Sequence, residues 1–364
     1  MRLHLTFATY ISRQFLGCWF GVFLALIALI AMFDTIEIMR RGANIQAMSM
    51  ANILTLVFFK LPHLIQKAIP FTILFGAMLA FWRLNRHHEL VVARSAGLSA
   101  WEFLAPVLIV TILIGVIKIT VYSSFASAMM FRYEQLENKH FPRKFSLATL
   151  SGKGLWLRQK VKNGHYLLHS PKITSPNMVL EPVTIFKFVN GDNFSSRIDA
   201  SHGILGDQVW HLKKVGITSP NAPLRKLKNY TVETNLTKEN IQDSFANPET
   251  MSFWALPGFI SVLENAGFSG LRHRLYWHSQ LADPALLCAM VLFAAACTLR
   301  LQRRGGTTTL IIIGVATGVL IFFATDVVYA LGLSARLPIF LAAWSPALVG
   351  CLLGMALLFH SEDG

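Results

Sequence analysis

The stretch RLNRHHELVVARSAGLSAW, residues 83–101, separates two long apolar runs and thereby decides how the chain is organised. It gathers cations and histidines around a single acid, Glu89, and ends in the small residues at 95–97. The pattern predicts a short amphipathic helix from Arg83 to Arg94. A polar helix between two long apolar runs is typical of a loop at a membrane surface, so we expect the runs on either side to span a membrane.

The composition agrees with a membrane protein. Of 364 residues, 54% are hydrophobic and only 14% are charged, whereas soluble proteins average about 25% charged residues. A helix needs about 20 apolar residues to cross a hydrocarbon core. Six spanning helices are predicted, at about residues 15–36, 56–82, 98–124, 279–300, 307–331 and 336–359. The second contains Pro62, Pro70 and Lys67, which indicates a helix that faces protein or water rather than lipid.

The region between the third and fourth predicted spans has a different character. Residues 142–250 alternate apolar and polar side chains over short stretches, as in GLWLR (154–158) and VTIFKF (183–188), with turn formers between them. This spacing predicts an antiparallel β-sandwich or open barrel, and residues 247–267 read as a short helical return to the membrane. The expected division is therefore residues 1–140 with three spans, 141–250 with the β domain, and 251–364 with a linker and three spans.

The number of crossings places the β domain on the membrane side opposite the N-terminus, and residues 83–97 on the same side as the N-terminus. An excess of Lys and Arg should mark the cytoplasmic loops. However, cations such as Arg40 and Arg41 follow the first span on the far side, so the count does not decide the orientation. Either the orientation is unusual or the far-side cations serve another purpose, and we favour the second explanation.

Motifs for catalysis and nucleotide binding are missing from the sequence. It contains neither G-x-x-x-x-G-K-[ST] nor H-E-x-x-H, and no Ser-His-Asp arrangement can be recognised. The four cysteines fall in apolar segments and read as small buried side chains rather than disulfides or metal ligands. We therefore predict no catalytic residue and no metal site. The helix at 83–97 is either a solvated loop or a docking helix for a soluble partner.

A family resemblance favours the docking helix. The sequence PFTILFGAMLAFWRLNRHHELVVARSAGLSAWEFLAP (70–106) closely resembles the LptF/LptG family of lipopolysaccharide-export permeases. The stretches RHRLYWHSQLADP (272–284) and LLFHSEDG (357–364) resemble the LptG branch more. The resemblance implies an α-helical membrane protein with six transmembrane helices and an inserted all-β, jellyroll-like periplasmic domain. It implies a permease subunit of an ATP-driven transporter that extracts lipopolysaccharide from the inner membrane and passes it toward the outer membrane.

The resemblance also assigns residues to the energy-coupling contact. In the family, the segment between the second and third spans is a coupling helix that docks on a cytoplasmic ATPase. Glu89 occupies the position of the family's coupling Glu, and we assign Arg86 and Arg94 to the same contact. Residues 83–97 are then cytoplasmic and the β domain is periplasmic.

The same resemblance explains why cations lie on the membrane side opposite the N-terminus. Basic residues at the periplasmic ends of the spans can pair with the phosphates of the lipid headgroup. Arg40, Arg41, Arg132 and Lys67 are the candidates, and ordinary snorkelling at a helix end is the alternative explanation. Another charge, Asp326, lies inside the fifth predicted span, where we expect it to pair with a basic residue such as Lys118.

The partners implied by the resemblance are a cytoplasmic ABC ATPase dimer, a second related permease, a periplasmic lipopolysaccharide-bridge protein and lipopolysaccharide itself. The chain needs no cofactor of its own, because the partner subunits bind ATP, and no nucleic acid is expected. The expected location is the bacterial inner membrane. Two alternatives stay open: a non-transporting scaffold that displays a periplasmic β domain, and a permease for another lipid or lipoprotein.

Overall fold

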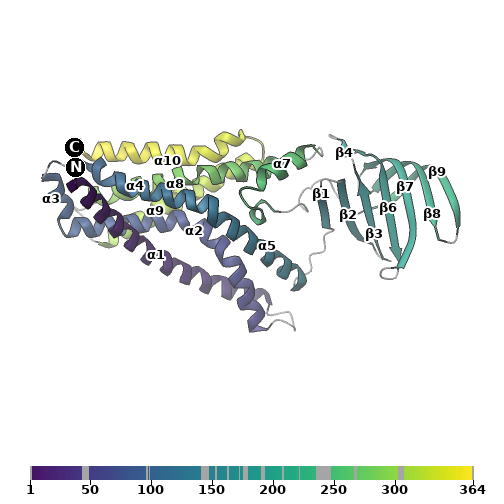
Figure 1. Cartoon of the computed structure of the whole chain (residues 1–364), viewed down its shortest axis with the longest axis horizontal. Coiled ribbons are helices and arrows are strands. Elements are labelled where there is room, and N and C mark those ends of the chain that lie inside the picture. Colours follow the sequence, from purple (N-terminus) through teal and green to yellow (C-terminus); the bar gives the residue numbers. More distant parts are fainter. Residues whose placement is uncertain are drawn as a thin grey trace. The chain divides into compact units, whose positions relative to one another are not determined.

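The computed structural model of the chain divides into two compact units (Figure 1). The first comprises Met1–His140, Ser252–Trp254 and Arg274–Gly364, and the second comprises Phe141–Met251 and Ala255–His273. The structure describes residues 2–42, 49–95, 97, 99–140, 147–151, 154–161, 164–171, 173–174, 179–189, 193–206, 209–220, 222–234, 247–265, 269–301 and 307–362.

The first unit contains the six predicted spans, each long and apolar enough to cross a membrane. They are formed by α1 (Arg2–Gly42), α2 (Met50–Arg86), the continuous run α4–η1–α5 (Ala100–Ile117, Lys118–Tyr122 and Ser123–His140), α8 (Leu271–Leu301), α9 (Thr307–Leu333) and α10 (Ile339–Glu362). The six-span prediction is confirmed. The helices extend beyond the predicted limits because an apolar run marks only the part that lies in hydrocarbon, while backbone hydrogen bonding continues past it.

The helices of this unit are buried to very different degrees. In α2 and α8 the most apolar window is 61% buried, whereas in α1 it is 6% and in α9 it is 11%. The hydrophobic core accordingly draws heavily on α2 and α8, with residues such as Ile73, Phe81 and Val291. The helices α1 and α9 therefore present most of their apolar side chains outward.

Helices α1 and α2 form an antiparallel hairpin whose register is fixed by polar contacts. Trp19 Nε1 donates a hydrogen bond to Thr72 Oγ1 at 3.0 Å. Nearer the α1–α2 turn, Lys60 of α2 forms an ion pair with the buried Asp34 of α1. Gly76, one turn beyond Thr72 on the side away from Lys60, allows the close approach of the helices, since a Cβ there would lie 2.7 Å from the Cα of Trp19.

A second antiparallel contact joins α2 to α9 through the two glycines of a G-x-x-x-G pattern. A Cβ on Gly314 would lie 2.6 Å from Met78 Sδ, and one on Gly318 would lie 3.3 Å from Phe71 Cδ1. One turn further along α9, the rings of Phe71 and Phe322 lie 5.5 Å apart between centroids. The small residues thus let the two helices pack closely over about two turns.

The third span contains a π-helical turn, η1, and it corrects one expectation. Lys118 does not pair with Asp326. Its Nζ lies 2.7 Å from Asp283 Oδ2 of α8, and Ser123 Oγ donates to Gln280 Oε1 of the same helix at 3.1 Å. The buried Lys118 side chain faces α8, whereas Asp326 lies on an exposed side of α9, so the two cannot meet.

The second unit is an antiparallel β-sheet, which confirms the inserted β region. The described strands are β1 (Leu147–Ser151), β2 (Gly154–Val161), β3 (Gly164–Ser170), β4 (Ile173–Thr174), β5 (Val179–Leu180), β6 (Val183–Val189), β7 (Asn193–Leu205), β8 (Val209–Ser219) and β9 (Ala222–Glu233). Hydrogen bonds join them in the order β1-β2-β3-β6-β7, after which β7 pairs with both β5 and β8. The polar sequence of β7 gave no clear strand signal, because pairing with its neighbours overrides weak local propensity.

One face of the sheet is closed by its own side chains and by a short amphipathic helix. The chain after the sheet forms η2 (Pro248–Thr250) and α7 (Leu256–Asn265), in agreement with the expected short helical return. Leu263 of α7 is buried in the same cluster as Trp210 and Leu168 of the strands. Inside this cluster, Tyr166 donates a hydrogen bond to Gln159, which also accepts one from Thr234.

Candidate functional site

The polar segment between the second and third spans is two helices rather than one. Helix α2 continues to Arg86, the chain turns at His87 and His88, and a separate helix, α3, spans Glu89–Ser95. The predicted continuous helix from Arg83 to Arg94 is therefore wrong. The break occurs at His88, whose φ of 59° places it in the left-handed region that interrupts a helix.

Glu89 stands at the first position of α3, where a carboxylate is favoured by the positive end of the helix dipole. Its Oε1 accepts a hydrogen bond from Tyr10 OH of α1 at 3.1 Å, which ties α3 to the start of the first span. Within α3, Ala93 is buried while the neighbouring Val92 is 65% exposed. The helix thus presents an apolar side chain as well as an acid to its surroundings.

The two arginines assigned to the same contact lie on different helices. Arg86 belongs to the end of α2, where its guanidinium lies 5.1 Å from the ring centroid of Trp82. Arg94 lies on α3, and its side chain is outside the described part of the structure. After α3, the third span begins with a capping box in which Ser99 and Glu102 satisfy each other's backbone N–H groups. This cap fixes the far end of the segment.

The predicted headgroup arginines lie together at the end of α1. Arg40 Nη2 and Arg41 Nε each lie 2.8 Å from a different oxygen of Glu37, one turn back on the same helix. Arg41 Nη1 also lies 4.0 Å from Glu137 Oε1 of α5. The arginine side chains remain 77% and 52% exposed, so the carboxylates hold them without covering them.

Arg132 lies on the neighbouring helix α5 and is exposed. The adjacent Tyr133 has its ring 5.8 Å from Lys60 Nζ, which in turn pairs with Asp34 of α1. Arg132 is therefore near the level of Asp34 along the bundle, in the same half as Arg40. The structure thus places Arg132 at the same end of the membrane unit as the α1 arginines.

Lys67 is not part of this group. It follows Lys60 by about two turns on α2, in the direction away from the α1–α2 turn, while Arg40 lies beyond Asp34 in the opposite direction. At 1.5 Å per residue, Lys67 and Arg40 are roughly 20 Å apart along the bundle axis. Lys67 is exposed near the middle of α2, and it belongs to a different part of the surface.

Sequence reasoning missed the acids of the site. Glu37 precedes Arg40 and Arg41 by three and four positions, a spacing that predicts helix-surface ion pairs and was visible in the sequence. Glu137 and the Asp34–Lys60 pair link different helices, and only the helix register brings them together.

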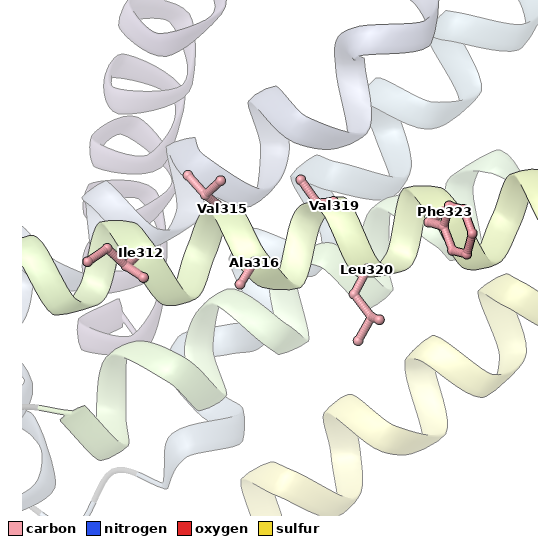
Figure 2. Close-up of a pocket in the computed structure, with 6 residues that line it drawn as sticks. All are labelled: Ile312, Val315, Ala316, Val319, Leu320 and Phe323. Atoms are coloured by element: carbon pink, nitrogen blue, oxygen red, sulfur yellow. The ribbon is translucent and has the colours of Figure 1, made fainter.

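Asp326 is exposed on α9. The same helix carries an apolar groove (Figure 2). The groove has a volume of about 660 Å³ and is lined by side chains of α9 alone. Figure 2 shows them spread along the helix; they are Ile312, Val315, Ala316, Val319, Leu320 and Phe323. Asp326 follows Phe323 by three positions and is therefore one turn beyond the groove.

The arrangement combines six apolar spans, an inserted β-sheet and an acid-headed polar helix, and the family model for the lipopolysaccharide export system permease LptF/LptG matches residues 9–360. The chain belongs to the LptF/LptG family. It is 23% identical over 371 residues to the lipopolysaccharide export system permease protein LptG of Haemophilus influenzae, covering 98% of this chain and 99% of the relative. It is 21% identical over 323 residues to LptG of Escherichia coli strain K12, covering 82% of this chain and 80% of the relative.

These matches confirm the family expected from residues 70–106, and the relatives bear the LptG name that the C-terminal segments indicated. As a member of the LptF/LptG family, the chain is a multi-pass membrane protein and a permease of lipopolysaccharide export. It is a transporter subunit rather than an enzyme, and it works in a complex with other Lpt components.

Proposed function

We propose that this permease is half of an ATP-driven machine that extracts lipopolysaccharide from the inner membrane and hands it to a periplasmic bridge protein. The observation that carries the proposal is the pair of exposed arginines at the end of α1, which in the described part of the chain form surface ion pairs with carboxylates. A guanidinium binds phosphate through two parallel hydrogen bonds, and adjacent guanidiniums suit a headgroup with several phosphate oxygens.

The carboxylate partners do not prevent this role. Exposed ion pairs at i,i+3 and i,i+4 positions are weak, because water and salt screen them and side-chain entropy opposes them. A phosphate dianion therefore displaces Glu37 from Arg40 and Arg41 at little cost. Arg132, near the same end of the bundle, can add a further contact to a large headgroup. In this proposal the three arginines face the periplasm, at the level where lipid phosphates lie.

In this proposal, the energy of ATP hydrolysis reaches the permease through α3. The sequence contains no phosphate-cradling motif, so nucleotide is bound by a partner, which we take to be a cytoplasmic ABC ATPase dimer. Glu89 and the exposed Val92 supply an acid and an apolar side chain for docking. Because α2 leads into α3 through a two-residue turn, a push on α3 is transmitted to the buried helix α2.

Transport also requires a second permease and a change of affinity. The sparsely buried helices α1 and α9 offer apolar surfaces that a related permease could cover, and the two subunits would enclose a chamber. A ligand shifts an equilibrium between two states only through different affinities for them. The chamber must therefore bind lipopolysaccharide when it is open and release it, by way of the β domain, when it closes.

The test is affinity purification of the full chain in mild detergent, with identification of bound proteins and lipids by mass spectrometry. We expect a P-loop ATPase, a second permease and lipopolysaccharide with the wild type, and loss of the ATPase alone with Glu89→Arg. Purification without any ATPase would favour the scaffold function. A different bound lipid would favour a permease for that lipid.

A further inference from the structure

The β unit carries a group of lysines that the proposed function does not use. Lys213 and Lys214 lie on β8, Lys226 and Lys228 lie on β9, and all four side chains are exposed. These four residues form the lysine group. Figure 1 shows β8 and β9 as neighbours at one end of the sheet. The headgroup arginines belong to the membrane unit, so the lysine group is a separate concentration of positive charge.

The strand register places the lysine group within a small area. Lys214 and Lys228 stand opposite each other, at a point where the paired positions skip one residue on both strands. Lys213 precedes Lys214 on β8, and Lys226 precedes Lys228 by two positions on β9. Opposite positions on neighbouring strands have their Cβ atoms about 5 Å apart. Along the strands, the group extends over roughly 10 Å.

The skipped pairing also turns these lysines to one face of the sheet. A regular strand alternates between its two faces, yet Lys213 and Lys214 are both exposed, and buried residues stand directly before and after them. On β9, Leu227 packs on the hydrophobic cluster of the β unit, while Lys226 and Lys228 on either side of it are exposed. The lysine group thus lies on the face opposite that cluster.

The acids on and beside the neighbouring strand β7 already have partners. Asp199, which the register sets beside β8, forms an ion pair with Arg197 at 2.8 Å. Glu181 lies 2.9 Å from His202. Among the residues that the structure describes, no Asp or Glu lies within ion-pair distance of any lysine in the group. Like charges at this spacing repel one another, and an anion with several charged oxygens removes the repulsion.

Lys214 adopts a backbone conformation that favours glycine. Its φ of 52° lies in the left-handed region, where the Cβ of any other residue crowds the backbone and costs free energy. A glycine would avoid that cost. The chain therefore holds a charged side chain at a position where the backbone alone favours a residue without one. Strain of this kind points to a function for the side chain.

We propose that the lysine group binds the phosphorylated saccharide of lipopolysaccharide on the outer face of the β unit. The inference rests on the proposed function, which brings lipopolysaccharide to this unit. Phosphate oxygens accept charge-assisted hydrogen bonds from ammonium groups. A lysine binds phosphate as a flexible point charge, so several lysines together suit phosphates whose positions vary along a saccharide.

The saccharide, rather than the acyl part of the lipid, is the ligand that this face suits. Acyl chains need an apolar surface, and the hydrophobic cluster of the unit lies on the other face. Binding at the lysine group holds the charged part of the molecule in water and away from that cluster. It also supplies a second contact for phosphates after the lipid has left Arg40 and Arg41.

Photocrosslinking is the first test, carried out on the complete complex in nanodiscs. A benzophenone amino acid replaces Asn229, which is exposed, uncharged and paired with Lys213. During ATP hydrolysis we expect an adduct with lipopolysaccharide that carries a phosphorylated core saccharide. The same probe at Asn193, which is exposed at the start of β7, should give much less adduct. Equal adduct at both positions would show contact without a site and would overturn the proposal.

Removal of charge tests the lysines themselves. Lys213→Gln with Lys228→Gln should lower the adduct at Asn229 about tenfold, since each exposed charge contact shifts an equilibrium by about threefold. Lys213→Arg with Lys228→Arg keeps both charges and should retain the adduct. An undiminished adduct in the glutamine variant would refute the role of the lysine group.

A matched control removes two charges elsewhere in the β unit, through Arg225→Gln with Lys187→Gln. Arg225 is paired with Ile217, which packs on the hydrophobic cluster, so it points to the other face of the sheet. Lys187 lies on β6. This control should keep most of the adduct. A loss equal to that of the glutamine variant of the lysine group would overturn the site, because it would reflect only the net charge of the unit.

The source of the phosphate is tested with the ligand. Lipopolysaccharide that lacks core phosphates but keeps its lipid A phosphates should co-purify with the complex and lose most of the adduct at Asn229. An unchanged adduct would refute the assignment to the saccharide. An adduct with phospholipid instead would refute it in favour of the membrane surface. Failure of the proposed function would show differently, as an absence of ATPase and lipopolysaccharide from the purified complex.

Lys214→Gly separates the charge of this lysine from its effect on the fold. The variant should not lower the midpoint of thermal unfolding of the full chain, because relief of the left-handed strain offsets the greater freedom of glycine in the unfolded chain. It should lower the adduct at Asn229 about threefold. A lower midpoint with an intact adduct would show a structural lysine and remove Lys214 from the site.

Discussion

Glu37 forms ion pairs with both Arg40 and Arg41 in the structure, so removing its charge should strengthen the binding of a phosphorylated lipid. The perturbation is Glu37→Gln, which keeps the size of the side chain and deletes its charge. Each oxygen of Glu37 lies 2.8 Å from one arginine, in an i,i+3 and an i,i+4 pair. An exposed pair of this kind shifts an equilibrium by about twofold, so the two pairs together should weaken lipid binding by about fourfold.

The assay is equilibrium binding of bisphosphorylated lipid A to the full permease complex in nanodiscs, at low and high salt. We expect Glu37→Gln to bind about four times more tightly at low salt, with a smaller gain at high salt because surface charges are screened. Glu137→Gln is the matched control. Its oxygen lies 4.0 Å from Arg41, farther than the 2.8 Å contacts of Glu37, so its effect should be smaller. The reasoning would be refuted if Glu37→Gln bound no more tightly while Arg40→Gln and Arg41→Gln each weakened binding.

Three further predictions concern other parts of the chain. Lys118→Ala leaves Asp283 without its Lys118 partner in a largely buried site, which should destabilise the membrane unit by about 3–5 kcal/mol in detergent unfolding assays. The double variant Lys118→Met, Asp283→Leu should be less destabilised than Lys118→Ala. An equal loss of stability in both variants would contradict the ion-pair explanation. Tyr10→Phe removes the hydrogen bond to Glu89 while leaving the acid for docking, so ATPase co-purification should fall less than with Glu89→Arg. Burial raises the pKa of Tyr166 from 10.0 to about 12. Because the folded state then holds the phenol proton more tightly than the unfolded state, the stability of the β unit should fall as the pH rises from about 10 to 12. Tyr166→Phe should remove this part of the pH dependence in a chemical denaturation series.

The spans and the β insert were predictable because each depends on a local pattern. An uninterrupted apolar run such as residues 16–33 satisfies its backbone hydrogen bonds in a membrane by forming a helix. Short alternating stretches such as 183–188 fit a half-buried strand. Strand β7 escaped prediction for the complementary reason. Its residues are polar, and it is held as a strand by pairing with β6 on one side and β8 on the other.

The candidate site was predictable where it lies within one helix and not where it joins several. The cations Arg40 and Arg41 and the spacing of Glu37 are properties of a single stretch of sequence. Lys118 pairs with Asp283 rather than with the expected Asp326, because of which side of each helix faces which neighbour. The sequence does not reveal that side, since hydrophobic periodicity is weak in spans that are apolar all round. The break at His88 was missed because a histidine gives no clear sequence signal for the left-handed conformation that it adopts here. A glycine at this position would have indicated a break.

The positions of the α1 arginines and of helix α2 suggest how one chain can both hold and expel a lipid. The arginines at the end of α1 are exposed and weakly paired, so a phosphate can exchange with Glu37 there without any helix moving. Binding at these arginines can therefore occur in the open state of the proposed chamber. Because α2 contacts α1, α9 and α3, it is the helix through which a displacement of α3 reaches the helix that carries the arginines.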